Sequence, residues 1–162
     1  MLCTSIYVDD GAVFSSSKEL MELTLENLRK HFDITADAMH TYIGIEINVR
    51  PDGGIIISQA AYIRDMLKKF GMTECNDAPT PMVSADLKPA EKCNENLPYR
   101  QLIGALLFLS RTVRPDIAFA VAKLSQFNNA YDEEQWVAAK RILRNLKGTM
   151  NGGLYYAPGT SK

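Results

Sequence analysis

The residues with the most chemical potential are two adjacent carboxylates, Asp9 and Asp10, in the sequence Tyr7-Val8-Asp9-Asp10. Neighbouring carboxylates repel each other unless a cation compensates their charge. Mg²⁺ prefers oxygen ligands and commonly uses one or two carboxylates together with substrate phosphates, and two such ions can stabilise both oxygens of a phosphoryl transfer. Asp-Asp-Gly is also a favourable turn sequence. The pair therefore predicts either a metal-dependent phosphoryl-transfer site or an ordinary turn.

A second candidate site is a basic set with helical spacing, Lys140, Arg144 and Lys147. Such side chains can neutralise nucleic-acid phosphates, and a solvated helix face is the alternative. For binding, all three must face solvent. The same helix carries apolar residues that we expect to face inward: Trp136, Leu143 and Leu146.

The charges are distributed unevenly along the chain, although the net charge is only −1. Residues 1–96 carry 9 basic and 15 acidic side chains, whereas residues 97–150 carry 8 basic and 4 acidic side chains. This asymmetry permits an anionic partner without requiring one.

Several protein classes are excluded by composition. Hydrophobic residues make up 46% of the 162 residues, which is typical of a globular protein. No apolar run reaches the roughly 18 residues of a membrane span, and the first residues lack the pattern of a signal peptide. The three cysteines, Cys3, Cys75 and Cys93, lie far from each other and from the two histidines. This usage predicts a reduced, intracellular protein without a zinc site.

The elements that position the carboxylates predict an α+β fold. Residues 4–8 and 12–14 predict a β-hairpin with its turn at Asp9-Asp10-Gly11. Ser16 and Glu19 predict a capping box that opens a helix. Residues 41–49 and 55–57 predict a second hairpin, and the helix after it is capped by Ser58 and ends at Gly71. We expect Asp9 and Asp10 to lie exposed at the first tip, and the 41–58 hairpin to lie in the same sheet or close to it.

The remainder of the chain is predicted to be mostly helical. Residues 73–98 hold four of the seven prolines and predict a linker. Helices are then expected over 99–112, from Pro115 to about Phe127, and from a capping box at Asp132 and Gln135 to Lys147. Residues 154–156 predict a short strand. The predicted organisation is therefore two ββα segments over 1–72, a linker, a helical region over 99–150 and a tail over 151–162.

Motifs spread over the whole chain resemble those of the reverse transcriptases of copia-type long-terminal-repeat retrotransposons. The first is Tyr7-Val8-Asp9-Asp10 between two apolar strands. The others follow in the family's order: Tyr42-Ile43-Gly44-Ile45-Glu46-Ile47, Ser58-Gln59, Tyr62-Ile63, Phe70-Gly71-Met72, Thr80-Pro81-Met82, Tyr99-Arg100, Ile103-Gly104, Arg114-Pro115-Asp116-Ile117, Leu124-Ser125, Trp136, Ala139-Lys140-Arg141-Ile142-Leu143, Leu146-Lys147-Gly148-Thr149 and Gly153-Leu154-Tyr155. Their order and spacing together are highly specific.

This resemblance implies an RNA-directed DNA polymerase of a Pol polyprotein that uses Mg²⁺ or Mn²⁺, a template–primer duplex and deoxynucleotides. Asp9 and Asp10 would be the second and third carboxylates of its metal triad. Tyr7 would lie beside the primer end and the incoming nucleotide. The 41–58 hairpin would be the primer grip, with the binding residues Tyr42, Gly44 and Glu46. Residues 1–72 would then be a partial palm, and residues 99–150 a thumb or connection that contacts the duplex.

The resemblance also implies that the chain matches the C-terminal part of the polymerase region. The family's first metal-binding aspartate and its fingers lie upstream of the matched motifs, and its ribonuclease H region begins after about Tyr156. We therefore expect the isolated chain not to polymerise DNA. The alternative is a non-catalytic nucleic-acid-binding or interaction remnant of a degraded retroelement. The expected location is intracellular, in cytoplasmic virus-like particles or in the nucleus.

Overall fold

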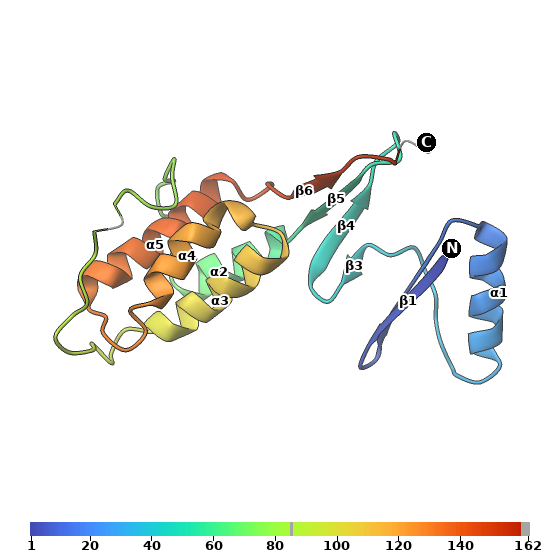
Figure 1. Ribbon diagram of the computed structural model, residues 1–162, viewed down its shortest axis with the longest axis horizontal. Coiled ribbons are helices and arrows are strands. Elements are labelled where there is room, and N and C mark those ends of the chain that lie inside the picture. The colour runs from blue at the N-terminus through green and yellow to red at the C-terminus, as the bar shows by residue number, and fades with distance from the viewer. Residues whose placement is uncertain (85, 160–162) are drawn as a thin grey trace. The chain divides into compact units, whose positions relative to one another are not determined.

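The computed structural model describes residues 1–84 and 86–159, and the chain divides into two compact units, residues 1–48 and residues 49 onward. The fold is mixed α and β with antiparallel sheets (Figure 1), as the sequence predicts. Among the described residues, no helix combines the length and apolar character needed to cross a bilayer.

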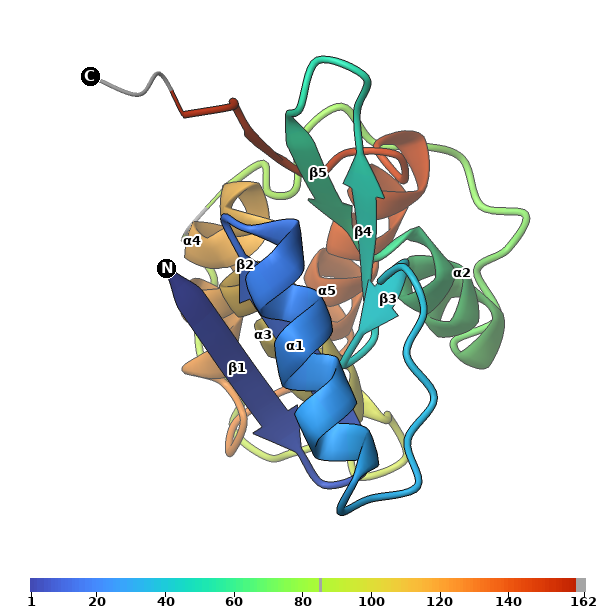
Figure 2. The same cartoon turned by 90° about the vertical axis from the view of Figure 1, so that its right-hand side faces the viewer.

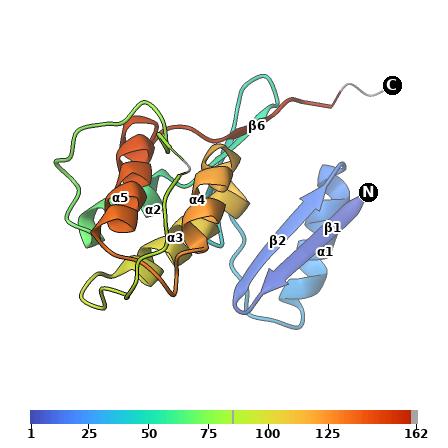
Figure 3. The same ribbon diagram turned by 60° about the vertical axis from the view of Figure 1, so that its left-hand side comes forward.

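The first unit begins with an antiparallel hairpin and a helix. Strands β1 (Leu2–Tyr7) and β2 (Asp10–Ser15) pair along their whole length, and α1 (Lys18–Arg29) lies against them (Figures 2 and 3). The helix is capped by Ser17, whose side chain accepts a hydrogen bond from the Leu20 amide. The predicted cap, Ser16, is wrong by one residue, because Ser17 has the extended backbone that a cap requires. Within residues 1–48, all of which are described, Ala12 is the only buried apolar side chain.

The strands of the second hairpin are predicted correctly. Strand β3 (Thr41–Tyr42) pairs with the start of β4 (Ile45–Val49), and β5 (Ile55–Ser58) follows a turn in which the Arg50 amide donates to the Gly54 carbonyl. However, β1 and β2 form a two-stranded sheet of their own, and β3 to β6 belong to another. In that second sheet, β5 pairs with the C-terminal strand β6 (Leu154–Tyr156).

Four helices and their apolar side chains form the core of the second unit. They are α2 (Ala60–Lys69), α3 (Tyr99–Thr112), α4 (Ala118–Ser125) and α5 (Glu133–Gly148), with a short 3₁₀ turn at Pro115–Ile117 before α4. Side chains at most 1% exposed hold them together: Ile63, Leu102, Ile103, Leu106, Leu109, Val121, Leu124, Ile142, Leu143 and Leu146. Removing this apolar surface from water is the main stabilising contribution to the unit.

The helix ends of the second unit follow the sequence signals with one exception. The capping box of Asp132 and Gln135 is present at the start of α5, and Gly71, with φ +66°, follows the end of α2. The residue before α2 is Gln59 instead of the predicted Ser58, because Ser58 is still the last residue of β5. Left-handed backbone at Gly71 is typical of the residue that ends a helix.

Residues 75–80, here called the strap, lie along α5 (Figure 1). They belong to the segment predicted as a linker, which has neither helix nor strand among its described residues. The Asn145 side chain donates to the Ala78 carbonyl at 3.0 Å, and Ala78 is only 3% exposed. Further along, the Gln135 side chain donates to the Lys88 carbonyl at 2.6 Å. The strap is therefore a packed part of the second unit, held through its main chain.

Candidate functional site

The two predicted metal-binding carboxylates lie at the tip of the first hairpin. Tyr7 and Asp10 are paired across the strands, which leaves Val8 and Asp9 as a two-residue loop. Asp9 and Asp10 are both exposed. Their exposed location at the hairpin tip is therefore confirmed. The turn itself is Val8-Asp9 instead of the predicted Asp9-Asp10-Gly11, because Asp10 and Gly11 already pair in β2.

The backbone of this tip is strained. Val8 has φ +52° and a side chain that is 81% exposed. A β-branched residue in the left-handed region is a conformational outlier and costs about 1–3 kcal/mol. Such conformations persist only where the surrounding structure imposes them, and they cluster at functional sites. The strain therefore marks the Tyr7–Asp10 turn as a place where the direction of the side chains is fixed at a cost in stability.

Strand register decides which side chains share a face with the carboxylates. Side chains alternate along a strand, and residues directly opposite each other lie on the same face. Tyr7 is opposite Asp10, and Ser5 is opposite Ala12. One face of the hairpin therefore carries Ser5, Tyr7, Asp10 and Ala12, whereas Asp9 belongs to the loop.

The predicted primer-grip residues lie around a second tight turn in the same unit. Tyr42 is paired with Ile45, and the loop between them, Ile43 and Gly44, has φ values of +50° and +72°. Two successive left-handed residues are the signature of a type I′ hairpin turn. Glu46 follows in β4, opposite Thr41. The Tyr42 hydroxyl shares a 2.9 Å hydrogen bond with the Ser5 hydroxyl, so the structure brings Tyr42 to the carboxylate-bearing hairpin.

The donor set at the hairpin tip suits a hard divalent cation. Asp9 and Asp10 supply carboxylate oxygens, and no group of three or more His, Cys, Asp or Glu side chains with metal-binding geometry occurs within the described part of the chain. Mg²⁺ keeps several waters and often takes only one or two carboxylates from the protein. The two carboxylates of the tip therefore match the number and type of protein ligands that such an ion takes.

The basic residues of α5 are arranged differently from the prediction. Trp136, Leu143 and Leu146 face inward, as expected. The three basic residues are all half-buried, and two of them donate to the strap. Arg144 Nε donates to the Asn76 carbonyl at 3.1 Å and Lys147 Nζ donates to the Cys75 carbonyl at 2.7 Å.

The third basic residue lies beyond the strap contacts. Lys140 is half-buried, with Nζ 5.5 Å from the centroid of the Trp136 ring, within range of a cation–π interaction. The strap thus divides the basic set into Lys140 and a pair that binds main-chain carbonyls. A role of these three residues in binding nucleic acid stays a prediction.

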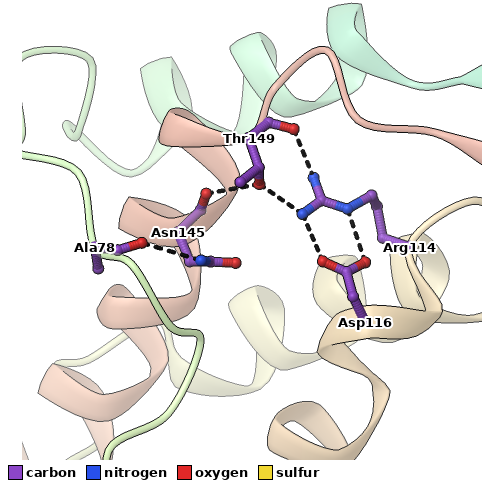
Figure 4. A network of polar contacts seen from close by, with 5 residues as sticks. All are labelled: Ala78, Arg114, Asp116, Asn145 and Thr149. Atoms are coloured by element: carbon purple, nitrogen blue, oxygen red, sulfur yellow. Dashed lines mark hydrogen bonds and ion pairs between the residues drawn. The ribbon is translucent and has the colours of Figure 1, made fainter.

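A polar network for which the sequence predicts no role lies at the C-terminal end of α5 (Figure 4). The Arg114 side chain, 4% exposed, donates to both oxygens of Asp116 at 2.9 and 2.7 Å and to the Thr149 carbonyl at 3.1 Å. The Thr149 hydroxyl accepts from Arg114 at 2.6 Å and donates to the Asn145 carbonyl at 2.8 Å. The hydrogen bonds from Arg114 hold the pKa of Asp116 below its ordinary value, and partial burial opposes this shift.

Comparisons with known proteins show which family the chain resembles. A family model described as reverse transcriptase (RNA-dependent DNA polymerase) matches residues 1–84. The chain is 36% identical over 160 residues to the retrovirus-related Pol polyprotein from transposon RE1 of Arabidopsis thaliana, covering 96% of this chain and 11% of the polyprotein. It is 32% identical over 155 residues to the corresponding polyprotein from transposon TNT 1-94 of Nicotiana tabacum, with shares of 89% and 12%.

A shorter relative is similar over nearly the same region. The uncharacterized mitochondrial protein AtMg00810 of Arabidopsis thaliana is 32% identical over 154 residues, which is 93% of this chain and 63% of that protein. No solved structure matches the chain. The chain spans about a tenth of the two Pol polyproteins. Since the family match covers just over half of the chain and includes the paired carboxylates, the chain belongs to the reverse transcriptase (RNA-dependent DNA polymerase) family, as found in the Pol polyproteins of copia-type retrotransposons.

Proposed function

We propose that the Tyr7–Asp10 hairpin serves the nucleotidyl-transfer site of an RNA-directed DNA polymerase. The substrates are a template–primer duplex and deoxynucleoside triphosphates. In the reaction the primer 3′-hydroxyl attacks the α-phosphate, and pyrophosphate leaves. The observation that carries the proposal is the hairpin tip, where two adjacent exposed carboxylates follow a tyrosine on a two-residue turn.

Asp9 and Asp10 would hold the divalent ion, Mg²⁺ or Mn²⁺. When bound, this ion neutralises negative charge on the phosphates and polarises the phosphoryl oxygens. Phosphoryl transfer requires mainly positioning and electrostatic stabilisation from the protein. The β1–β2 register supplies the positioning, because it sets Tyr7 opposite Asp10 on one face. Tyr7, 58% exposed on that face, is placed to contact the primer end or the incoming nucleotide.

The finer assignments belong to the same proposal. The first hairpin and α1 would be part of the palm, and Gly44 and Glu46 would contact the primer as part of a primer grip. Helices α3 to α5 would form a thumb-like region. Lys140 is the basic residue of α5 that we assign to a phosphate of the duplex, because Arg144 and Lys147 already donate to the strap.

A chimera tests this function. The 160-residue stretch of the RE1 polyprotein that matches this chain is replaced by the chain itself. Primer extension is then measured with Mg²⁺ and labelled deoxynucleotides. We expect extension that falls to the level of an enzyme-free blank in Asp10→Asn and persists in Asp37→Asn, an exposed carboxylate of the same unit.

Two results would contradict the proposal. In one, the Asp10→Asn chimera extends the primer as fast as its parent. In the other, the parent chimera binds template–primer without extending it, which is the behaviour expected of a non-catalytic remnant. Binding is measured separately, by fluorescence anisotropy of a labelled duplex, so that a misfolded chimera is recognised.

A further inference from the structure

Two tight turns with the same construction lie in the first unit. In each, a tyrosine precedes a two-residue loop and is paired with the residue after it, Tyr7 with Asp10 and Tyr42 with Ile45. Each loop begins with a β-branched residue in the left-handed region, Val8 at φ +52° and Ile43 at φ +50°. Both turns are therefore strained at the same position, and each needs support from the structure around it.

A side-chain hydrogen bond connects these two turns. Ser5 Oγ and Tyr42 Oη lie 2.9 Å apart, although the two residues are 37 positions apart in the chain. Ser5 lies two residues before Tyr7 and on the same face of the hairpin, because side chains alternate along a strand. The Tyr42 hydroxyl therefore binds the face that carries Tyr7 and Asp10.

The first hairpin receives little support from apolar packing. Ala12 is the only buried apolar side chain among residues 1–48, all of which are described, and α1 contains no buried residue. A two-stranded hairpin is only marginally stable by itself. The Ser5–Tyr42 hydrogen bond therefore supplements this limited packing with a contact from another segment.

We infer that Tyr42 is a positioning residue, which acts through Ser5 to hold the Tyr7–Asp10 turn in the geometry that binds the divalent ion. This inference rests on the proposed function of the hairpin. It gives Tyr42 a role different from the primer contact that the family resemblance implies, because its hydroxyl is engaged with Ser5. Tyr42 acts on the turn that carries the ion-binding carboxylates, whereas Gly44 and Glu46 remain assigned to the primer.

The test uses the full 162-residue chain and Mn²⁺ alone as the probe. Mn²⁺ binding is measured by the relaxation of water protons, and Asp10→Asn identifies the signal that comes from the hairpin. Tyr42→Phe and Ser5→Ala each remove one hydroxyl, and Ser5→Thr retains it. Tyr156→Phe is the matched control, because it removes an exposed tyrosine hydroxyl from β6. Amide hydrogen exchange at Tyr7 and Asp10 is measured by NMR for every variant without metal.

We expect Tyr42→Phe and Ser5→Ala each to weaken Mn²⁺ binding about two- to tenfold, the range set by the net contribution of one neutral hydrogen bond. The double variant should be no weaker than either single variant, because both remove the same bond. Ser5→Thr should restore binding, and Tyr156→Phe should leave it unchanged. Exchange at Tyr7 and Asp10 should accelerate in Tyr42→Phe, Ser5→Ala and the double variant, and should stay unchanged in Ser5→Thr and Tyr156→Phe.

The outcomes separate the inference from the proposed function. If the parent chain binds Mn²⁺ through Asp10 and Tyr42→Phe binds it equally well, the positioning role is wrong and the metal site stands. If the parent chain binds no Mn²⁺, the isolated hairpin fails as a metal site, and hydrogen exchange then decides whether Tyr42 fixes the turn. Unchanged exchange in both Tyr42→Phe and Ser5→Ala overturns the inference in either case.

Discussion

Replacing Arg114 by methionine should destabilise the second unit strongly. The substitution keeps a side chain of similar length and removes all four hydrogen bonds that the guanidinium donates, two to Asp116 and two to Thr149. Arg114 is almost fully buried, with a side chain that is 4% exposed. The network links the segment before α4 to the end of α5, so its loss affects the packing of both.

The expected loss of stability depends on how Asp116 and Thr149, the former partners of Arg114, are satisfied after the substitution. Hydrogen bonds to a charged group contribute about 1.5–3 kcal/mol each, but the Asp116 side chain is 53% exposed, so water replaces much of what Asp116 loses. The Thr149 carbonyl loses one donor and keeps another, the Gly152 amide at 2.9 Å, so this loss costs only about 1 kcal/mol. The Thr149 hydroxyl retains its bond to the Asn145 carbonyl. We therefore expect a decrease of about 2–4 kcal/mol in the free energy of unfolding.

Urea unfolding followed by tryptophan fluorescence measures this decrease. The chain has a single tryptophan, Trp136, which is 8% exposed on α5, so the signal reports on the second unit. Arg111→Met is the matched control, because Arg111 is an exposed arginine on α3. We expect the control to change stability by less than about 0.5 kcal/mol. A loss in Arg114→Met no larger than that of the control would refute the structural role of the network.

Three further predictions concern pH, the α5 surface and activity. The folded pKa of Asp116 is lowered, so its contribution is present above the unfolded pKa and is lost as pH falls through the folded one. The stability difference between the parent and Asp116→Asn should therefore shrink on acidification in urea titrations, and a constant difference would contradict this. Lys140→Ala should weaken template–primer binding and lower the salt slope by about one. It should lower the urea midpoint less than Arg144→Ala and Lys147→Ala, because it removes a cation–π contact with Trp136 and they remove hydrogen bonds to the strap. The isolated chain should give no primer extension above a blank, because two exposed carboxylates alone do not fix a metal pair. Robust extension would show that reasoning to be wrong.

Features encoded by neighbouring residues could be predicted from the sequence. The turn after Tyr7, the capping box of Asp132 and Gln135 and the end of α2 before Gly71 all depend on residues within a few positions. The helix cap at Ser16 or Ser17 could not be decided in this way. Both serines can accept the capping hydrogen bond, and only the backbone angles of the folded chain select Ser17.

Contacts between distant segments could not be predicted, and they determine much of the candidate site. The strap binds α5 through the carbonyls of Cys75, Asn76 and Ala78, and every residue type has a carbonyl. The side chains of the strap therefore give no indication of its partners. The hydrogen bond between Ser5 and Tyr42 could not be predicted from residue spacing either, because it depends on where two separate hairpins lie in the folded unit.

The strap also constrains the order in which the second unit can form during synthesis. Its partners on α5 lie 61 to 72 positions later in the chain, from Arg141 opposite Thr80 to Lys147 opposite Cys75. The ribosome therefore releases the strap well before the helix that binds it, and closing such long loops is slow. Until residues 141–147 have emerged, the strap lacks its partners on α5. A nascent chain arrested before α5 should remain sensitive to protease between residues 73 and 98 and should become resistant once the helix is complete.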